Sequence, residues 1–270
     1  MTYEEFIARK RHSYGEFGFE PKYIPDIAFD FQKFVIEKAI RKGRVACFLD
    51  TGLGKTLIQL AIANNIILHT NKRVLILTPL AVAFQFLLEA EKIGIDDIEY
   101  CKDGKFTKKI VICNYERLHY FDAKDFECVI LDESSILKNF DGKIKAEVTA
   151  FIKKTPYRFL STATPSPNDF IELGTSSEVL GYMGYMDMLG KFFKNNQNSV
   201  DSTNRNIGEK FYLKPHAEKD FFSWVNQWSI MAKMPSDLGF SDKDYILPEL
   251  ITQKHFVKNQ SLIDINGQIQ

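Results

Sequence analysis

The segment from Asp50 to Thr56 combines residue types that can hold a chain of phosphate groups. Gly52 and Gly54 have no side chain, so the backbone N–H groups beside them stay open to an anion. Lys55 can neutralise the β- and γ-phosphates, and the hydroxyl of Thr56 can hold a magnesium ion. We therefore predict a phosphate-binding loop. Its nucleotide-binding residues are Thr51, Gly52, Leu53, Gly54, Lys55 and Thr56.

The neighbouring sequence supports this interpretation, although the strict P-loop pattern has a glycine where this chain has Leu49. Residues 44–49 are typical of a short buried strand, and residues 57–68 have apolar side chains at helical spacing. Strand, loop and helix thus follow in the order that a phosphate site needs. The motif alone also fits an ordinary strand–turn–helix. In this context we predict binding of ATP with Mg²⁺.

A second candidate lies at the end of an apolar run, where Asp132 and Glu133 follow one another. A strand over residues 129–131 would place both carboxylates at the edge of the sheet where the phosphates lie. We predict that Asp132 holds Mg²⁺ through water and that Glu133 is the general base that activates the attacking water. With Lys55, these are the predicted catalytic residues. Taken alone, the pair could be a solvated turn that caps the next helix.

Strand-like and helical stretches alternate along the first 165 residues. This pattern predicts an α/β fold in which helices flank a mostly parallel sheet, with ligands bound at the carboxyl ends of its strands. After about residue 169 the composition changes, and we expect a smaller, partly helical accessory region. That region includes a polar loop over 194–206 and a helix over 217–232.

Composition sets broad limits on the class of protein. The chain has 270 residues, of which 45% are hydrophobic and 26% charged, and its formal net charge is zero. Neutrality gives no support for a nucleic-acid partner, although a local basic face would be enough to bind one. Four widely spaced cysteines predict reduced, buried thiols. We find no membrane-spanning or signal-peptide pattern, so we expect a cytoplasmic protein with no membrane partner.

Several stretches, in this order, resemble the motifs of superfamily-two helicases and translocases. The resemblance is closest to the Swi/Snf-related branch, including versions from phages and prophages, and it covers about residues 25–255. The stretches that carry it are FDFQKF (29–34), DTGLGKT (50–56), LILTPLAVAFQFLLEAEK (75–92), VICNYERL (111–118), VILDESSILKN (129–139), RFLSTATPSPND (158–169) and WSIMAKMPSDLGFSDKDYILPEL (228–250).

The resemblance assigns further roles, each as an expectation. Gln32 matches a glutamine that reads adenine, whereas a lone glutamine on a helix is usually just solvated. Nucleic-acid contacts are expected from Thr78, Pro79, Asn114, Tyr115 and Arg117. Coupling between the metal site and the nucleic acid is expected from Ser161, Thr162 and Thr164.

The resemblance also implies a domain organisation. Residues 1–168 would form a RecA-like ATP-binding lobe, residues 169–255 an accessory insertion that closes it, and residues 256–270 the start of a linker. A second helicase lobe, which carries the arginine finger in this family, is expected outside these residues. The 270 residues alone should therefore hydrolyse ATP only weakly.

This chain departs from the family pattern at two places. Ser134 and Ser135 stand where the family has alanine and histidine, so the usual histidine link between hydrolysis and DNA is missing. Ala163 replaces a frequent glycine. Two basic features have ordinary explanations: Arg158 as a surface or packing residue, and a solvated face made by Lys105, Lys108 and Lys109.

The favoured hypothesis is the ATP-binding lobe of a helicase or translocase that hydrolyses ATP to move along nucleic acid, DNA rather than RNA. One alternative is a nucleic-acid-binding module that ATP switches without significant hydrolysis. Glu133 argues against it, because a switch needs no base. Another alternative is the motor of a restriction-type complex, for which these residues contain no nuclease or methyltransferase sequence.

Overall fold

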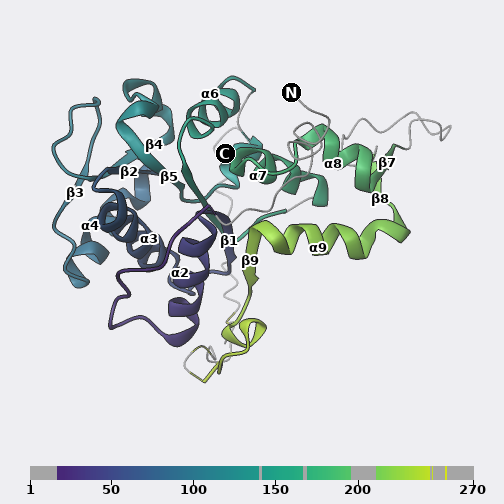
Figure 1. The fold of residues 1–270 in the computed structure, drawn as a ribbon, viewed down its shortest axis with the longest axis horizontal. Helices are drawn as coiled ribbons and strands as arrows, with labels where there is room; N and C mark the ends of the chain where they lie inside the picture. The colour runs from purple at the N-terminus through teal and green to yellow at the C-terminus, as the bar shows by residue number, and fades with distance from the viewer. Residues whose placement is uncertain are drawn as a thin grey trace, which may run out of the picture.

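A parallel β-sheet forms the centre of the protein (Figure 1). The computed structural model describes residues 17–139, 142–166, 169–195 and 211–243, together with 245 and 253. Within these ranges the sheet has seven strands in the order β3-β4-β2-β5-β6-β1-β9, and each neighbouring pair is parallel. The strands are β1 (Arg44–Leu49), β2 (Arg73–Thr78), β3 (Ile98–Tyr100), β4 (Ile110–Asn114), β5 (Phe126–Leu131), β6 (Tyr157–Thr162) and β9 (Ser229–Ala232).

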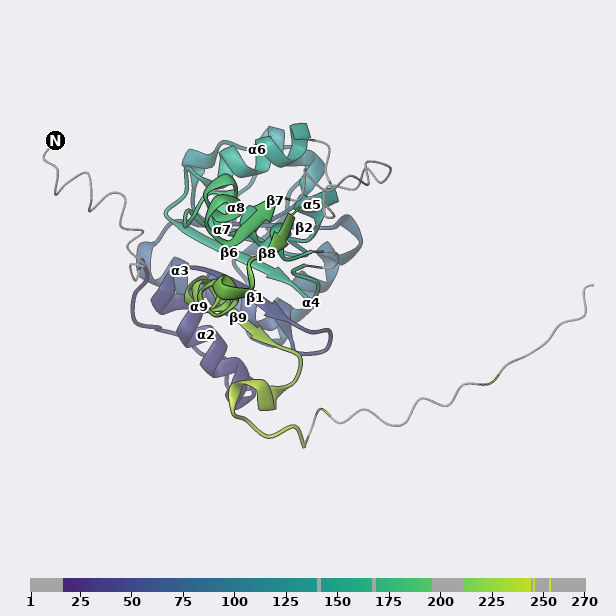
Figure 2. The ribbon, with the colours of Figure 1, turned by 90° about the vertical axis from the view of Figure 1, so that its right-hand side faces the viewer.

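Helices cover both faces of this sheet, and Figure 2 shows α6, α7 and α8 on one side of the strands and α2 on the other. One face packs against α2 (Asp30–Lys42), α3 (Lys55–Thr70) and α4 (Ala83–Lys92). The elements on the opposite face are η2 (Tyr115–Tyr120), α5 (Ile136–Asn139), α6 (Gly142–Ile152), α7 (Leu173–Leu180), α8 (Tyr185–Phe192) and α9 (Glu218–Trp228). Short 3₁₀ turns connect several of them, namely η1 (Leu80–Val82), η3 (Ala123–Asp125), η4 (Phe170–Glu172), η6 (Pro215–Ala217) and η7 (Pro235–Leu238).

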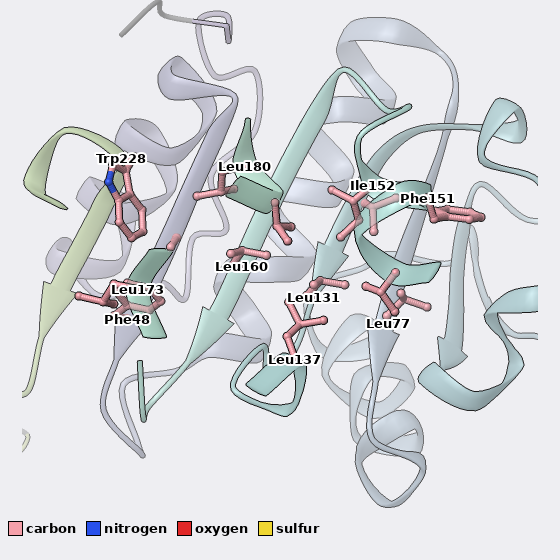
Figure 3. Packing of buried hydrophobic residues seen from close by; sticks show 14 of the residues in the cluster. Phe48, Leu77, Leu131, Leu137, Phe151, Ile152, Leu160, Leu173, Leu180 and Trp228 are labelled. Carbon is pink, nitrogen blue, oxygen red and sulfur yellow. The ribbon is translucent and has the colours of Figure 1, made fainter. Parts of the chain in front are cut away.

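Two hydrophobic cores result, because successive side chains of a strand point to opposite faces. In β1, Ala46 and Phe48 belong to one core, whereas Val45 and Cys47 belong to the other. Figure 3 shows the first core, in which Phe48, Leu160, Leu131 and Leu77 form a row across the sheet below the helices that cover this face. Burial on both faces explains why these strands are apolar throughout, as parallel sheets require.

The predicted fold class is therefore confirmed, with a difference in the second half of the chain. The region expected as an accessory insertion returns to the main sheet: β9 pairs with β1, from Ala46 opposite Ser229 to Leu49 opposite Ala232. The helix predicted over 217–232 is accordingly wrong after Trp228, where the chain becomes a strand because β1 offers an open edge. The division of the chain at residue 168 stays a prediction.

The smaller part that extends from the sheet contains α8, α9 and a hairpin, at the right of Figure 1. The hairpin pairs β7 (Phe193–Asn195) with β8 (Phe211–Leu213) in antiparallel fashion. Most of the polar loop predicted over 194–206 and all of the linker predicted over 256–270 lie outside the described residues.

Arg158, at the start of β6, has a packing role. It is 7% exposed, and its guanidinium donates hydrogen bonds to the carbonyl oxygens of Lys153, Thr155 and Val179. Burial and the nearby charge of Arg44 lower the pKa of Arg158 to about 10. This arginine ties α6 and α7 to the sheet, at the end away from the phosphate-binding loop.

The four cysteines are free and buried, as expected. Burial raises the pKa of Cys47 and of Cys113 to about 12, so these thiols stay protonated.

No helix in the described ranges has the length and apolar character needed to cross a membrane.

Candidate nucleotide-binding site

The loop between β1 and α3 has the backbone that its glycines predict. Gly52 and Gly54 have φ angles of 88° and 76°, in the left-handed region that glycine adopts at little cost. Gly54 is the N-cap of α3, so the first N–H groups of this helix point into the loop. Lys55 Nζ donates to the carbonyl oxygens of Leu49 and Asp50 at 3.1 and 3.2 Å. The loop thus holds an ammonium group beside open backbone donors, which suits a phosphate chain.

A cavity of about 510 Å³ lies beside this loop, within the size range of small-molecule sites. It joins the phosphate-binding loop to the two carboxylates that follow β5 and to one side of α4. The lining residues are Thr51, Gly52, Gly54, Lys55, Thr56, Leu57, Val82, Gln85, Glu89, Asp132 and Glu133. Of these, Leu57, Val82, Gln85 and Glu89 were not predicted. The contribution of α4 depends on how that helix packs, so no local motif could reveal it.

Asp132 is held by hydrogen bonds from two neighbouring elements. Its side chain is buried, with Oδ1 accepting from Gln59 Nε2 at 2.8 Å and Oδ2 accepting from Thr78 Oγ1 at 2.9 Å. Gln59 comes from α3 and Thr78 ends β2. The carboxylate is therefore oriented by the protein itself. Gln59 was not predicted as a site residue. Its signal in the sequence is a polar side chain within the apolar run of the helix.

These oxygen donors fit a magnesium ion. Mg²⁺ prefers hard oxygen ligands and usually keeps several of its waters. Each carboxylate oxygen of Asp132 has a second lone pair beyond the one that Gln59 or Thr78 uses. Thr56 lines the same cavity. A water-mediated contact from Asp132 and a direct one from Thr56 are compatible with this arrangement.

Glu133 has an unusual backbone and an unpaired oxygen. Its φ of 51° is left-handed, a conformation that costs a non-glycine residue about 1–3 kcal/mol. Its Oε2 is buried and has no hydrogen-bond partner among the described residues. A buried polar atom without a partner calls for an explanation, and a water or metal-bound ligand in the adjoining cavity would provide one. Glu133 thus has the environment expected of a group that acts on a bound substrate.

Gln32 is buried beside the loop and is not solvated. It is 5% exposed; its Oε1 accepts from the backbone N–H of Phe29 at 2.9 Å, and its Nε2 donates to the carbonyl of Leu53 at 3.2 Å. The amide keeps a second N–H and a second lone pair, so contact with an adenine edge remains chemically possible. Its role in adenine recognition stays a prediction.

Gly54→Ala is expected to destabilise the protein by about 1–2 kcal/mol or more, because alanine resists the left-handed backbone. A Cβ at Gly54 would also lie 2.2 Å from Gln32 Nε2. The amide would then have to move and lose its hydrogen bond to the carbonyl oxygen of Leu53. The measurement is the urea midpoint of unfolding. Gly190→Ala is the control, since a Cβ there meets nothing within 4 Å and its φ is not left-handed. Equal midpoints for the two variants would contradict the prediction.

The coupling candidates lie at and just after the end of β6, next to the carboxylates. Ser161 accepts a backbone hydrogen bond from Ser134 N at 2.9 Å, and Thr162 Oγ1 accepts from Thr164 N at 3.1 Å. Ser161 and Thr162 are buried, whereas Thr164 is exposed. The main chain after Glu133 is thus attached to the end of β6, and the coupling role of these residues stays a prediction.

The nucleic-acid candidates divide into buried and surface residues. Thr78 is fully buried and Tyr115 is 2% exposed, and both donate hydrogen bonds to Asp132. Each hydroxyl is directed inward by an acceptor at the strand ends, and contact of these two residues with nucleic acid stays a prediction. Asn114 is also buried, and its amide pairs with Tyr100 and Glu116.

Pro79 and Arg117 are the members of this set that reach the surface, and both are half-buried. Arg117 donates to the carbonyl of Lys102 at 3.2 Å. They follow β2 and β4, so they lie at the same end of the sheet as the cavity. These two side chains are the accessible members of the predicted set, and their contact with nucleic acid stays a prediction.

Residues 29–172 match the DEAD/DEAH box helicase family, and the chain belongs to this family. The match runs from the start of α2 to the turn before α7. It includes the phosphate-binding loop, both carboxylates and the end of β6.

Solved structures show the same fold. The Swi2/Snf2 ATPase core of Sulfolobus solfataricus in complex with double-stranded DNA is 18% identical, with a TM-score of 0.59, over 80% of this chain and 46% of that one. The core domain of that ATPase gives 17% identity and a TM-score of 0.58, over 79% of this chain and 45% of that one. This chain thus spans less than half the length of these relatives. No curated protein matches it in sequence.

Proposed function

We propose that this chain is the ATP-binding lobe of a nucleic-acid-dependent ATPase of the Swi/Snf-related type, which hydrolyses ATP to move along DNA. One observation carries the proposal. The predicted phosphate-binding loop, Asp132 and Glu133 line a single cavity, and Oε2 of Glu133 is buried without a hydrogen-bond partner among the described residues. A site that only bound phosphate would not need a glutamate with a left-handed backbone and an unpaired carboxylate oxygen at this position.

Each residue of the cavity has a role in this proposal. The backbone of Gly52 and Gly54 cradles the phosphates, and Lys55 exchanges its two carbonyl partners for phosphate oxygens. Thr56 and Asp132 hold Mg²⁺, which when bound would neutralise charge that develops on the phosphates. Glu133 takes a proton from the attacking water.

The proposed partner is DNA in preference to RNA, in keeping with the resemblance to the Swi/Snf-related branch, with Pro79 and Arg117 contributing to the contact. The phage or prophage type and a cytoplasmic location in a bacterial or infected cell also belong to the proposal. A second lobe would complete the site and supply the arginine finger. Without it, we expect weak activity from these 270 residues.

The test is the ATPase rate of the full natural chain with duplex DNA, single-stranded DNA and RNA added separately. We expect duplex DNA to raise the rate most. Stimulation by RNA alone would overturn the choice of DNA. Binding of ATP without hydrolysis under all three conditions would favour the alternative of an ATP-switched binding module.

A further inference from the structure

Tyr115 joins two loops that β2 separates in the sheet. It is the first residue after β4, and its side chain enters the protein. Its hydroxyl donates to the main-chain carbonyl of Asp132 at 2.6 Å. Because β2 lies between β4 and β5, the phenol spans the end of an intervening strand. The loop that begins at Asn114 is thus hydrogen-bonded directly to the peptide between the two site carboxylates.

The position of this acceptor matters for Glu133. A peptide group is planar, so a bond that holds the carbonyl of Asp132 also sets the direction of the N–H of Glu133. Glu133 then enters the left-handed region, with a φ of 51°, which glutamate seldom adopts. Such a conformation persists only where surrounding contacts enforce it. The bond from Tyr115 is one such contact, at the peptide where the strain begins.

The phenol of Tyr115 is the donor of this bond. Burial, with the nearby carboxylates of Asp132 and Glu133, raises the pKa of Tyr115 well above its ordinary value, which is in keeping with a protonated hydroxyl.

The other end of this loop reaches the surface. Glu116 is exposed and Arg117 is half-buried, and both directly follow Tyr115 on η2. The side chain of Asn114, just before Tyr115, accepts a hydrogen bond from Tyr100 and donates one to Glu116. A nucleic-acid strand bound against this surface would press on the backbone that carries Tyr115 and could shift it.

We propose that Tyr115 is a positioning residue of the ATPase. Its hydroxyl holds the Asp132–Glu133 peptide so that the carboxylate of Glu133 faces the nucleotide cavity. Through the same bond, the loop after β4 influences the hydrolysis step. This inference rests on the proposed ATPase function, and it assigns to Tyr115 a role inside the protein in place of contact with nucleic acid.

The test compares Tyr115→Phe with Tyr182→Phe in the full natural chain. Phenylalanine keeps the ring and removes only the hydroxyl. Tyr182 is a matched control, because its hydroxyl also donates to a main-chain carbonyl, that of Arg44 at 2.8 Å. Arg44 begins β1, at the end of the sheet away from the cavity.

For Tyr115→Phe we expect kcat at saturating nucleic acid to fall about tenfold, the size of effect that one buried hydrogen bond has. The KM for ATP and the Kd for nucleic acid should stay within about twofold, because the binding groups are untouched. Tyr182→Phe should leave all three values unchanged. Calorimetric stoichiometry of ATP binding corrects kcat for any loss of folded protein.

Equal kcat values for the two variants would overturn the positioning role. A crystal structure of Tyr115→Phe gives an independent decision: we expect the φ of Glu133 to leave the left-handed region or its carboxylate to move. If both stay unchanged, the inference is wrong. A parent protein that hydrolyses no ATP with any nucleic acid would overturn the proposed function instead, and the crystal structure would still decide whether Tyr115 positions Glu133.

Discussion

Glu133→Gln is expected to lower the ATPase rate of the full natural chain by about 10²–10⁴-fold, as loss of a general base does. Glutamine has nearly the same shape but cannot accept the proton. Binding of ATP with Mg²⁺ should remain within a few-fold of the parent value, because Lys55, Thr56 and Asp132 are unchanged. Steady-state hydrolysis and calorimetric binding measure the two quantities separately.

Glu127→Gln is the control for this change, since Glu127 lies on β5 itself, at its other end. Its carboxylate pairs with Lys72 at 2.6 Å, and Lys72 is largely exposed. We expect the control to turn over ATP at the parent rate. A Glu133→Gln protein that did the same would remove Glu133 from the role of base.

Lys55→Ala is expected to weaken ATP binding by about 100-fold, the loss of one or two hydrogen bonds between charged groups. The fold should survive, because within the described part of the chain the hydrogen bonds of Lys55 Nζ go to the carbonyl oxygens of Leu49 and Asp50 in the same loop. Calorimetry measures the affinity, and circular dichroism checks the fold.

Lys33→Ala removes a lysine outside the cavity, where Lys33 pairs with exposed Asp30 at 3.1 Å. This control should bind ATP as the parent protein does. If Lys55→Ala also bound ATP unchanged while it remained folded, the phosphate-binding role of the loop would be refuted.

The sequence identified the long, regular elements of the fold well. The apolar runs that became β1, β2, β4, β5 and β6 are buried on both faces, and this leaves a continuous hydrophobic signature. Two shorter strands of the seven-stranded sheet, β3 and β9, were not identified. They have three and four residues, and in β9 the pattern could not be distinguished from the end of a helix. Their strand conformation depends on pairing with β4 and β1, which are distant in the sequence.

The sequence also determined the glycine loop between β1 and α3 and the two carboxylates at a strand end. These features depend on residues that are adjacent in the chain, so type and spacing are enough to define them. Gly52 and Gly54 adopt the left-handed backbone that their type allows. The left-handed φ of Glu133 had no such signal, because nothing in a glutamate favours it.

Only the tertiary structure decided what surrounds Asp132. Its hydrogen bonds from Gln59, Thr78 and Tyr115 join residues 73, 54 and 17 positions apart in the chain. They exist because the strand order β4-β2-β5 brings three strand ends together, with α3 packed against them. Thr78 and Tyr115 were predicted to contact nucleic acid, and their hydroxyls are directed inward to Asp132. A residue at a strand end can face outward or inward, and the nearest hydrogen-bond acceptor in three dimensions decides which.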